Sequence, residues 1–183
     1  MAKIIRQYQS EIYGNYRLAY LYYGILTGVL LALTVFFQRL LFPSTLSSPE
    51  SYVTDGVLAV SIFLAAWHYR SRLPHQKVML KELLLVGIGM SMVASLLYGL
   101  LLWFLCGVAF PDIVQSFIMH RLSVMPSPEE SPDAFVAVAR TKDYTAGDWA
   151  FIGGFRVFVI SIIFVFFAAI IFKTEKSPQK TIK

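Results

Sequence analysis

The stretch that most constrains this chain covers residues 83–110, which are 28 residues without a charge. Coiled as an α-helix it would be about 42 Å long, whereas the hydrocarbon core of a typical bilayer is about 30 Å thick. A segment of this length and character predicts a membrane-spanning helix. We expect it to leave the hydrocarbon core near Cys106, because keeping its full length inside would require more tilt than is usual.

The composition favours the same class. The chain is 57% hydrophobic and 15% charged, whereas soluble domains average about 25% charged residues. Its net charge of +5 is spread beside the apolar segments and not massed on one face, which argues against nucleic-acid binding. The single cysteine excludes an intrachain disulfide. We therefore predict an all-α integral membrane protein.

Four apolar segments make up the predicted membrane domain, which covers residues 18–172. The transmembrane helices are expected at about residues 18–37, 52–69, 83–106 and 151–172. A cleaved signal peptide is the competing interpretation of the first segment. It would need a shorter apolar region and a small-residue cleavage site, and neither is present here.

Three of the polar segments outside these spans carry predictions of their own. Residues 1–17 carry apolar and tyrosine side chains at helical spacing, which predicts an amphipathic helix in the membrane interface, with a short soluble lead-in as the alternative. The loop 111–148 opens with a similar pattern, which predicts a second interfacial helix. Residues 173–183 form a basic tail.

Basic residues are divided unequally between the two sides of a four-span protein. Eleven of the sixteen lie before the first span, between the second and third, or after the fourth. The loop 111–148, on the opposite side, has six acidic residues against three basic ones. By the positive-inside rule, both termini are predicted to lie in the cytoplasm and this loop outside.

Small side chains recur at every fourth position in the first half of the third span, at Gly87, Ser91, Ser95 and Gly99. On a helix these residues form one ridge, where another backbone can approach closely, as in many pairs of membrane helices. The ridge either packs against a neighbouring span of the same chain or faces a second subunit. The spacing itself leaves both alternatives open.

Two charged residues are placed near membrane depth by this arrangement. Asp55 lies in the first turn of the second span, and Arg156 lies about one turn inside the fourth. Both belong to the outer half, and charges there are costly unless they are paired or solvated. We hypothesise an intramembrane ion pair between Asp55 and Arg156. The alternative is that Arg156 extends its side chain to lipid phosphates.

The reactive residues do not form the pattern of an enzyme. The histidines His68, His75 and His120 are scattered, without paired cysteines or a metal-binding motif. No nucleophile motif and no phosphate-binding glycine loop is present. We expect no catalytic residue, no metal ion and no cofactor.

One long segment resembles a known family. The run KELLLVGIGMSMVASLLYGLLLWFLCGVAFPDIVQSF is similar to the domain of unknown function 4199 family, whose members are small membrane proteins common in Bacteroidetes. Those proteins combine a third span rich in Gly and Ser, an aromatic exit, an acidic loop and a final span containing Gly-Gly. Phe110 stands where the family pattern has an acidic residue before proline. The resemblance implies a bacterial inner-membrane protein and no particular activity.

The function expected from these features is non-enzymatic. We predict a structural or accessory subunit that docks on a larger membrane assembly through the small-residue ridge and the outer loop. Two alternatives remain, a small homo-oligomeric transporter or permeation protein and an envelope sensor that uses the outer loop. The implied partners are the lipid bilayer and other protein chains, or further copies of this chain, held through the third span.

Overall fold

A computed structural model describes residues 16–41, 52–73, 78–112, 114–115, 118–119 and 144–173. Within these residues the regular structure is helical and contains no strand. The four long helices are α2 (Tyr16–Leu41), α3 (Tyr52–Arg72), α4 (Leu80–Phe104) and α7 (Ala146–Phe172). A short π-helical turn, η2 (Leu105–Ala109), continues α4.

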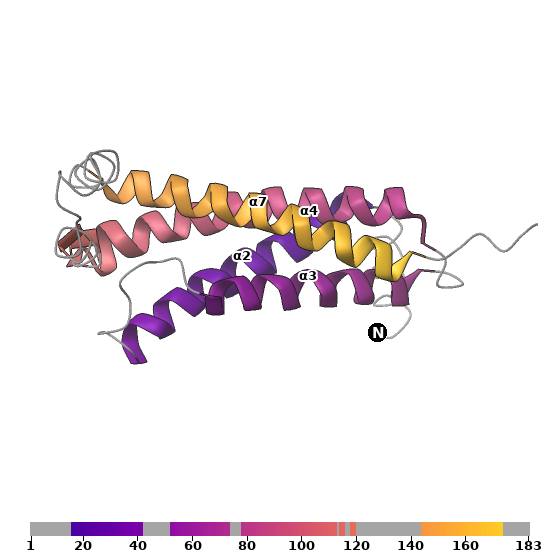
Figure 1. Cartoon of the computed structure of the whole chain (residues 1–183), viewed down its shortest axis with the longest axis horizontal. Coiled ribbons are helices and arrows are strands. Elements are labelled where there is room, and N and C mark those ends of the chain that lie inside the picture. The colour runs from indigo at the N-terminus through magenta and orange to yellow at the C-terminus, as the bar shows by residue number, and fades with distance from the viewer. Residues whose placement is uncertain are drawn as a thin grey trace, which may run out of the picture.

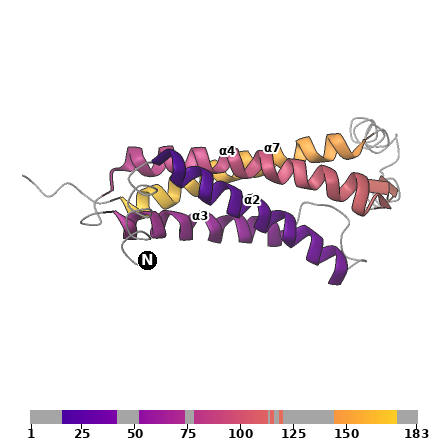
Figure 2. The same ribbon diagram turned by 180° about the vertical axis from the view of Figure 1, so that it is seen from behind.

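The four helices form one elongated bundle, in which α4 packs mainly against α7 and α2 (Figure 1). The helix α4 contacts α7 on one side and α2 on the other, and α3 lies across from it between α2 and α7. The helices α2 and α4 run in one direction, and α3 and α7 run in the other. Seen from behind, α2 crosses the bundle obliquely (Figure 2). The shortest helix, α3, begins part of the way along its neighbours.

Glycines in α2 allow its close approach to α4. A Cβ atom added at Gly24 would lie 2.6 Å from the Cβ of Val93, and one added at Gly28 would lie 3.0 Å from the carbonyl oxygen of Ala94. No ordinary side chain fits in that space, so the two backbones are nearly in contact. Large residues fill the rest of the core, among them Leu31, Leu58, Met90, Tyr98 and Leu102.

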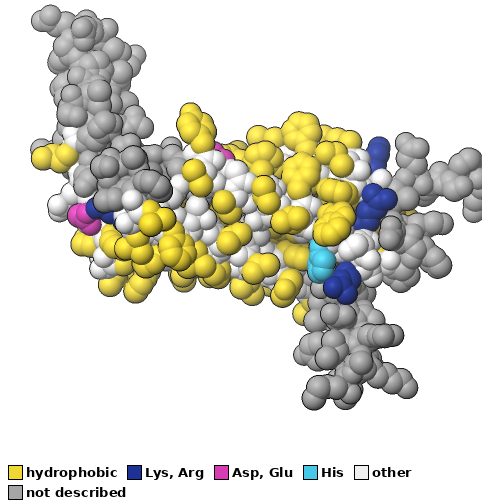
Figure 3. Space-filling model, turned by 90° about the horizontal axis from the view of Figure 1, so that it is seen from below, with side chains coloured by type: hydrophobic (Ala, Val, Ile, Leu, Met, Phe, Trp, Pro, Cys, Tyr) yellow, Lys and Arg dark blue, Asp and Glu magenta, His cyan; other side chains and the backbone are white. Residues whose placement is uncertain are grey.

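The outer surface of the bundle is strongly apolar. Three of the described helices are long and apolar enough to cross a membrane, at Leu18–Leu41, Leu80–Ala109 and Ala146–Phe172. Large hydrophobic side chains on them face outward. Leu96, for example, is 67% exposed and Phe151 is 74% exposed. Hydrophobic side chains cover the middle of the face in Figure 3, while basic side chains gather toward one end. The chain is therefore a helical, multi-pass membrane protein.

The helices extend beyond the predicted spans, because backbone hydrogen bonds continue past the last apolar residue. The largest difference is at α7, which begins at Ala146 and not near residue 151. Thr145 caps it, since the Asp148 N–H donates to the Thr145 hydroxyl at 3.3 Å and the Thr145 N–H donates to the Asp148 carboxylate at 2.8 Å. This reciprocal arrangement satisfies amide groups that a helix start leaves unpaired.

The exit of α4 has its own geometry. The helix continues as the π-helical turn η2 from Leu105, and the Phe110 N–H donates to the Leu105 carbonyl at 2.7 Å. Pro111 follows directly, and it has no N–H with which to extend the helix. The predicted exit near Cys106 thus falls inside this turn.

Other predictions fall on parts of the chain that are not described. The interfacial helix of residues 1–17, apart from its last two residues, lies outside the described residues. The same holds for most of the loop 111–148, including His120, and for the tail 173–183 beyond Lys173.

Candidate functional site

The two charged residues suspected from the sequence lie side by side. Nη2 of Arg156, in α7, donates to Oδ2 of Asp55, in α3, at 2.7 Å. The side chains are 27% and 23% exposed, respectively, so each is mostly enclosed by the bundle. The ion pair thus joins two helices that are far apart in the sequence.

Arg156 lies farther from the start of its helix than the sequence suggested. Arg156 is the eleventh residue of α7, so it lies about 15 Å from the start of the helix. The prediction put it one turn inside because it began the helix near residue 151. Asp55 reaches the same level because α3 begins only at Tyr52, part of the way along the bundle (Figure 1).

The electrostatics of the pair favour a fixed contact. An arginine keeps its charge in proteins, so Arg156 is not suited to take part in a proton relay. An unpaired cation or carboxylate among apolar side chains would be costly. Each charged side chain therefore offsets the free-energy cost of enclosing the other among apolar side chains. The pair also holds α3, the most polar of the four helices, against α7.

A second ion pair was not foreseen. Arg39, at the end of α2, donates to the carboxylate of Asp112, which follows η2. Asp112 is 56% exposed, so this contact lies at the rim of the bundle. The sequence offered a weak signal, since both residues follow spans that end on the same side.

The small-residue ridge of α4 lies against α7 of the same chain. A Cβ atom added at Gly87 would be 2.4 Å from Cγ1 of Val165, and one added at Gly99 would be 3.1 Å from the carbonyl oxygen of Ala150. Between them, Ser91 is 1% exposed and Ser95 is 8% exposed.

The matching surface on α7 is the Gly-Gly pair at 153–154. A Cβ atom at Gly154 would lie 3.0 Å from the Ser95 carbonyl oxygen and 3.5 Å from the Cα of Gly99. The two backbones therefore touch here. The serine hydroxyls of the ridge donate within α4, from Ser91 to the Gly87 carbonyl at 2.8 Å and from Ser95 to the Met92 carbonyl at 3.0 Å.

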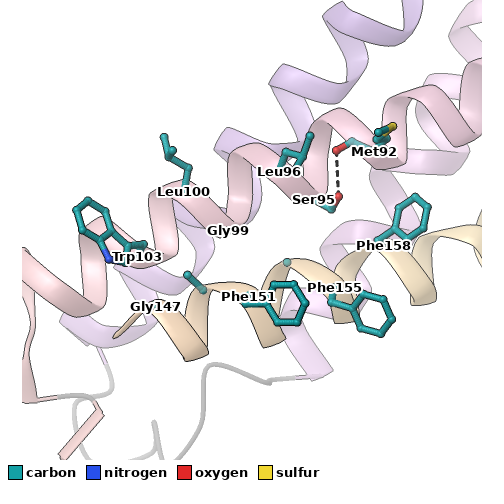
Figure 4. Close-up of a pocket in the computed structure, with 12 residues that line it drawn as sticks. Met92, Ser95, Leu96, Gly99, Leu100, Trp103, Gly147, Phe151, Phe155 and Phe158 are labelled. Atoms are coloured by element: carbon teal, nitrogen blue, oxygen red, sulfur yellow. Dashed lines mark hydrogen bonds between the residues drawn. The ribbon is translucent and has the colours of Figure 1, made fainter. Parts of the chain in front are cut away.

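An open groove runs outside this contact, between α4 and α7. Its volume is about 490 Å³. Gly99, Gly147 and Gly154 are among its lining residues. Aromatic side chains border it (Figure 4). These aromatic residues are Trp103, Phe151, Phe155 and Phe158. We refer to it as the α4–α7 groove. Its lining is almost wholly apolar, since its one serine, Ser95, donates to a carbonyl of its own helix.

The remaining candidates for chemistry are separate from one another. Among the described residues, no group of three or more His, Cys, Asp or Glu side chains is placed to hold a metal ion. Cys106 is buried. His68 lies at the other end of the bundle, where its Nδ1 is 2.9 Å from the Tyr23 hydroxyl.

Comparison with known proteins identifies one match. The family described as "Protein of unknown function (DUF4199)" matches residues 22–174. This range extends from the second turn of α2 to just beyond the end of α7. No curated protein and no solved structure matches the chain.

Proposed function

This chain belongs to the DUF4199 family of proteins of unknown function, and we propose that it is a non-enzymatic accessory or structural subunit of a larger membrane assembly. In this proposal all four helices cross the bacterial inner membrane, including α3. Both termini lie in the cytoplasm, and the loop 111–148 lies outside.

The observation that carries the proposal is the α4–α7 groove. The ridge of α4 is largely occupied by α7 of the same chain, so the bundle closes without a second copy. The groove is left open on the outer face, about 16 Å long from the level of Met92 to that of Trp103. Its small residues allow a close approach and its aromatic border offers contact area, which suits an apolar helix of a partner protein.

The distribution of charge supports the proposed orientation. One end of the bundle carries the described basic residues Arg70, Arg72, Lys81 and Lys173. At the opposite end Arg39 is paired with Asp112, and Asp148 lies in the first turn of α7. Lys and Arg are enriched on the cytoplasmic side of membrane proteins, so we place the first end inside.

A second function is favoured by the ion pair between Asp55 and Arg156. Charges at membrane depth often belong to the pathways of transporters. A homo-oligomer could open this pair to an ion or an anionic solute. The sensor alternative depends on the loop 111–148, which is mostly outside the described residues.

The test is to extract the protein from its native membrane in mild detergent and to determine the mass and composition of the complex. We expect a defined heteromeric complex. Truncation of the groove border, in Leu100→Ala with Phe151→Ala, should release the partner. The matched control is Leu85→Ala, which removes a similarly exposed side chain of α4 outside the groove.

Recovery of a homo-oligomer or a monomer alone would contradict the accessory role. A homo-oligomer that moves a solute in liposomes, with loss of transport in Asp55→Asn, would instead establish the transport function.

A further inference from the structure

A second groove lies between α2 and α3. Its volume is about 330 Å³, and we call it the α2–α3 groove. The exposed side chains Tyr22 and Leu26 of α2 and Leu64 and Trp67 of α3 form its walls. Buried or small residues form its floor, among them Tyr23, Thr27 and Ala65.

This groove changes character along its length. The part of the groove near Leu30 and Ser61 is lined mainly by aliphatic side chains. The Ser61 hydroxyl donates to the Val57 carbonyl of its own helix at 2.8 Å. Its other part, near Tyr22 and His68, is aromatic and polar. The two parts are separated by about 12 Å along α2. The polar part lies toward the basic end of the bundle.

A chain of polar contacts occupies this polar part. Nε of Arg72 donates to Nε2 of His68 at 3.3 Å, and His68 Nδ1 lies 2.9 Å from the Tyr23 hydroxyl. Because Nε2 accepts from Arg72, Nδ1 is the nitrogen that carries the proton and donates to Tyr23. The exposed guanidinium of Arg72 is thus oriented by a histidine that itself lines the groove.

The surface view agrees with this arrangement. In Figure 3, histidine and basic side chains lie next to each other at the border of the apolar region. An apolar groove that ends at an oriented guanidinium complements a molecule with a hydrocarbon chain and an anionic headgroup. Arginine is well suited to phosphate, because its planar fork of N–H groups matches two phosphate oxygens.

We propose that the α2–α3 groove binds an anionic phospholipid, with an acyl chain between the helices and the phosphate held by Arg72. His68 and Tyr23 are the positioning residues for that guanidinium. The acyl chain lies against Leu26, Leu30 and Leu64. The site requires α2 and α3 to lie in a bilayer with Arg72 at its surface, and it is independent of any protein partner at the α4–α7 groove.

The test uses the full chain reconstituted in an equimolar mixture of phosphatidylglycerol and phosphatidylcholine. After extraction in mild detergent, native mass spectrometry counts the lipids that remain bound. The wild-type protein should retain phosphatidylglycerol in preference to phosphatidylcholine. Arg72→Gln should lower that preference roughly tenfold, because it removes the charge-assisted hydrogen bonds to the phosphate.

Two further variants separate this site from general charge attraction. Arg70→Gln removes the same charge from the same end of α3 and should leave the preference unchanged. Leu64→Trp, at an exposed wall position, fills the groove without altering the charge and should lower the retention of phosphatidylglycerol. The proposal is overturned if the wild-type protein shows no preference, if both arginine variants lose it equally, or if Leu64→Trp retains as much lipid as the wild type.

Discussion

Replacement of Asp55 by arginine is expected to destabilise the bundle by about 3 kcal/mol, because it removes the partner of Arg156 and adds a second cation beside it. The pair lies about 15 Å from the start of α7, and both side chains are mostly enclosed by the bundle, so a charge left without its partner there is poorly compensated. The free energy of unfolding can be measured by titration with a denaturing detergent in mixed micelles, followed by circular dichroism. Arg156→Asp alone should have a similar effect.

The charge-swapped double variant, Asp55→Arg with Arg156→Asp, separates pairing from the effect of each charge. We expect it to recover most of the stability that either single variant loses. The matched control is Asp112→Arg, which breaks the ion pair to Arg39 at the exposed rim and should cost at most about 1 kcal/mol. If the double variant is no more stable than the single variants, the contact between Asp55 and Arg156 contributes nothing to the free energy of unfolding.

Replacement of Gly154 by leucine is expected to have the second large effect, a loss of about 3 kcal/mol through overpacking. The Cβ of residue 154 would lie 3.0 Å from the Ser95 carbonyl oxygen, which belongs to the backbone of α4 and cannot rotate aside. The two helices would have to separate along their closest contact. The same detergent titration measures the loss.

Gly56 provides the control for this substitution. It lies in α3, and a Cβ atom added there has nothing within 4 Å. Gly56→Ala should therefore stabilise the helix by about 0.5–1 kcal/mol, since alanine has the higher helix propensity. Equal tolerance of Gly154→Leu and Gly56→Ala would show that α4 and α7 do not meet at these glycines.

Much of the helical architecture could be predicted from the residues. Segment 83–110 and the other long apolar segments are predicted to be helices, because a segment that spans a bilayer must satisfy its own backbone hydrogen bonds. Helix ends were less predictable from hydropathy. The start of α7 is set by Thr145 and Asp148, a polar pair that a scan for apolar residues passes over although its capping pattern is visible in the sequence.

Contacts between helices were harder to predict, because they depend on how each helix is rotated about its axis. The spacing of Gly87, Ser91, Ser95 and Gly99 identified a face, but it could not tell whether α7 or a second copy covers it. Gly154 is a contact residue because α7 lies beside α4, which its spacing in the sequence does not indicate. The α2–α3 groove likewise had no signal in the sequence, since Tyr23 and His68 are 45 residues apart.

The helix α3 has a particular role in the bundle. It is the least apolar of the four helices, and two of its polar contacts with neighbouring helices lie at different levels of the bundle. Asp55 joins it to Arg156 of α7, and His68 joins it to Tyr23 of α2. Polar groups of this kind can bind helices together in a bilayer, where unpaired groups are costly. Whether α3 crosses the membrane therefore decides where both contacts lie relative to the bilayer.

The most direct test of the proposal that α3 crosses the membrane is labelling of single cysteines with a membrane-impermeant thiol reagent. The labelling uses a chain whose Cys106 is replaced by alanine. Ser47 and His75 lie on either side of α3, and Ser131 and Ser177 lie on either side of α7. Cysteines at 47 and 131 should be labelled in intact cells, and those at 75 and 177 only after the inner membrane is permeabilised. Labelling of positions 47 and 75 from the same side would contradict the four-span bundle.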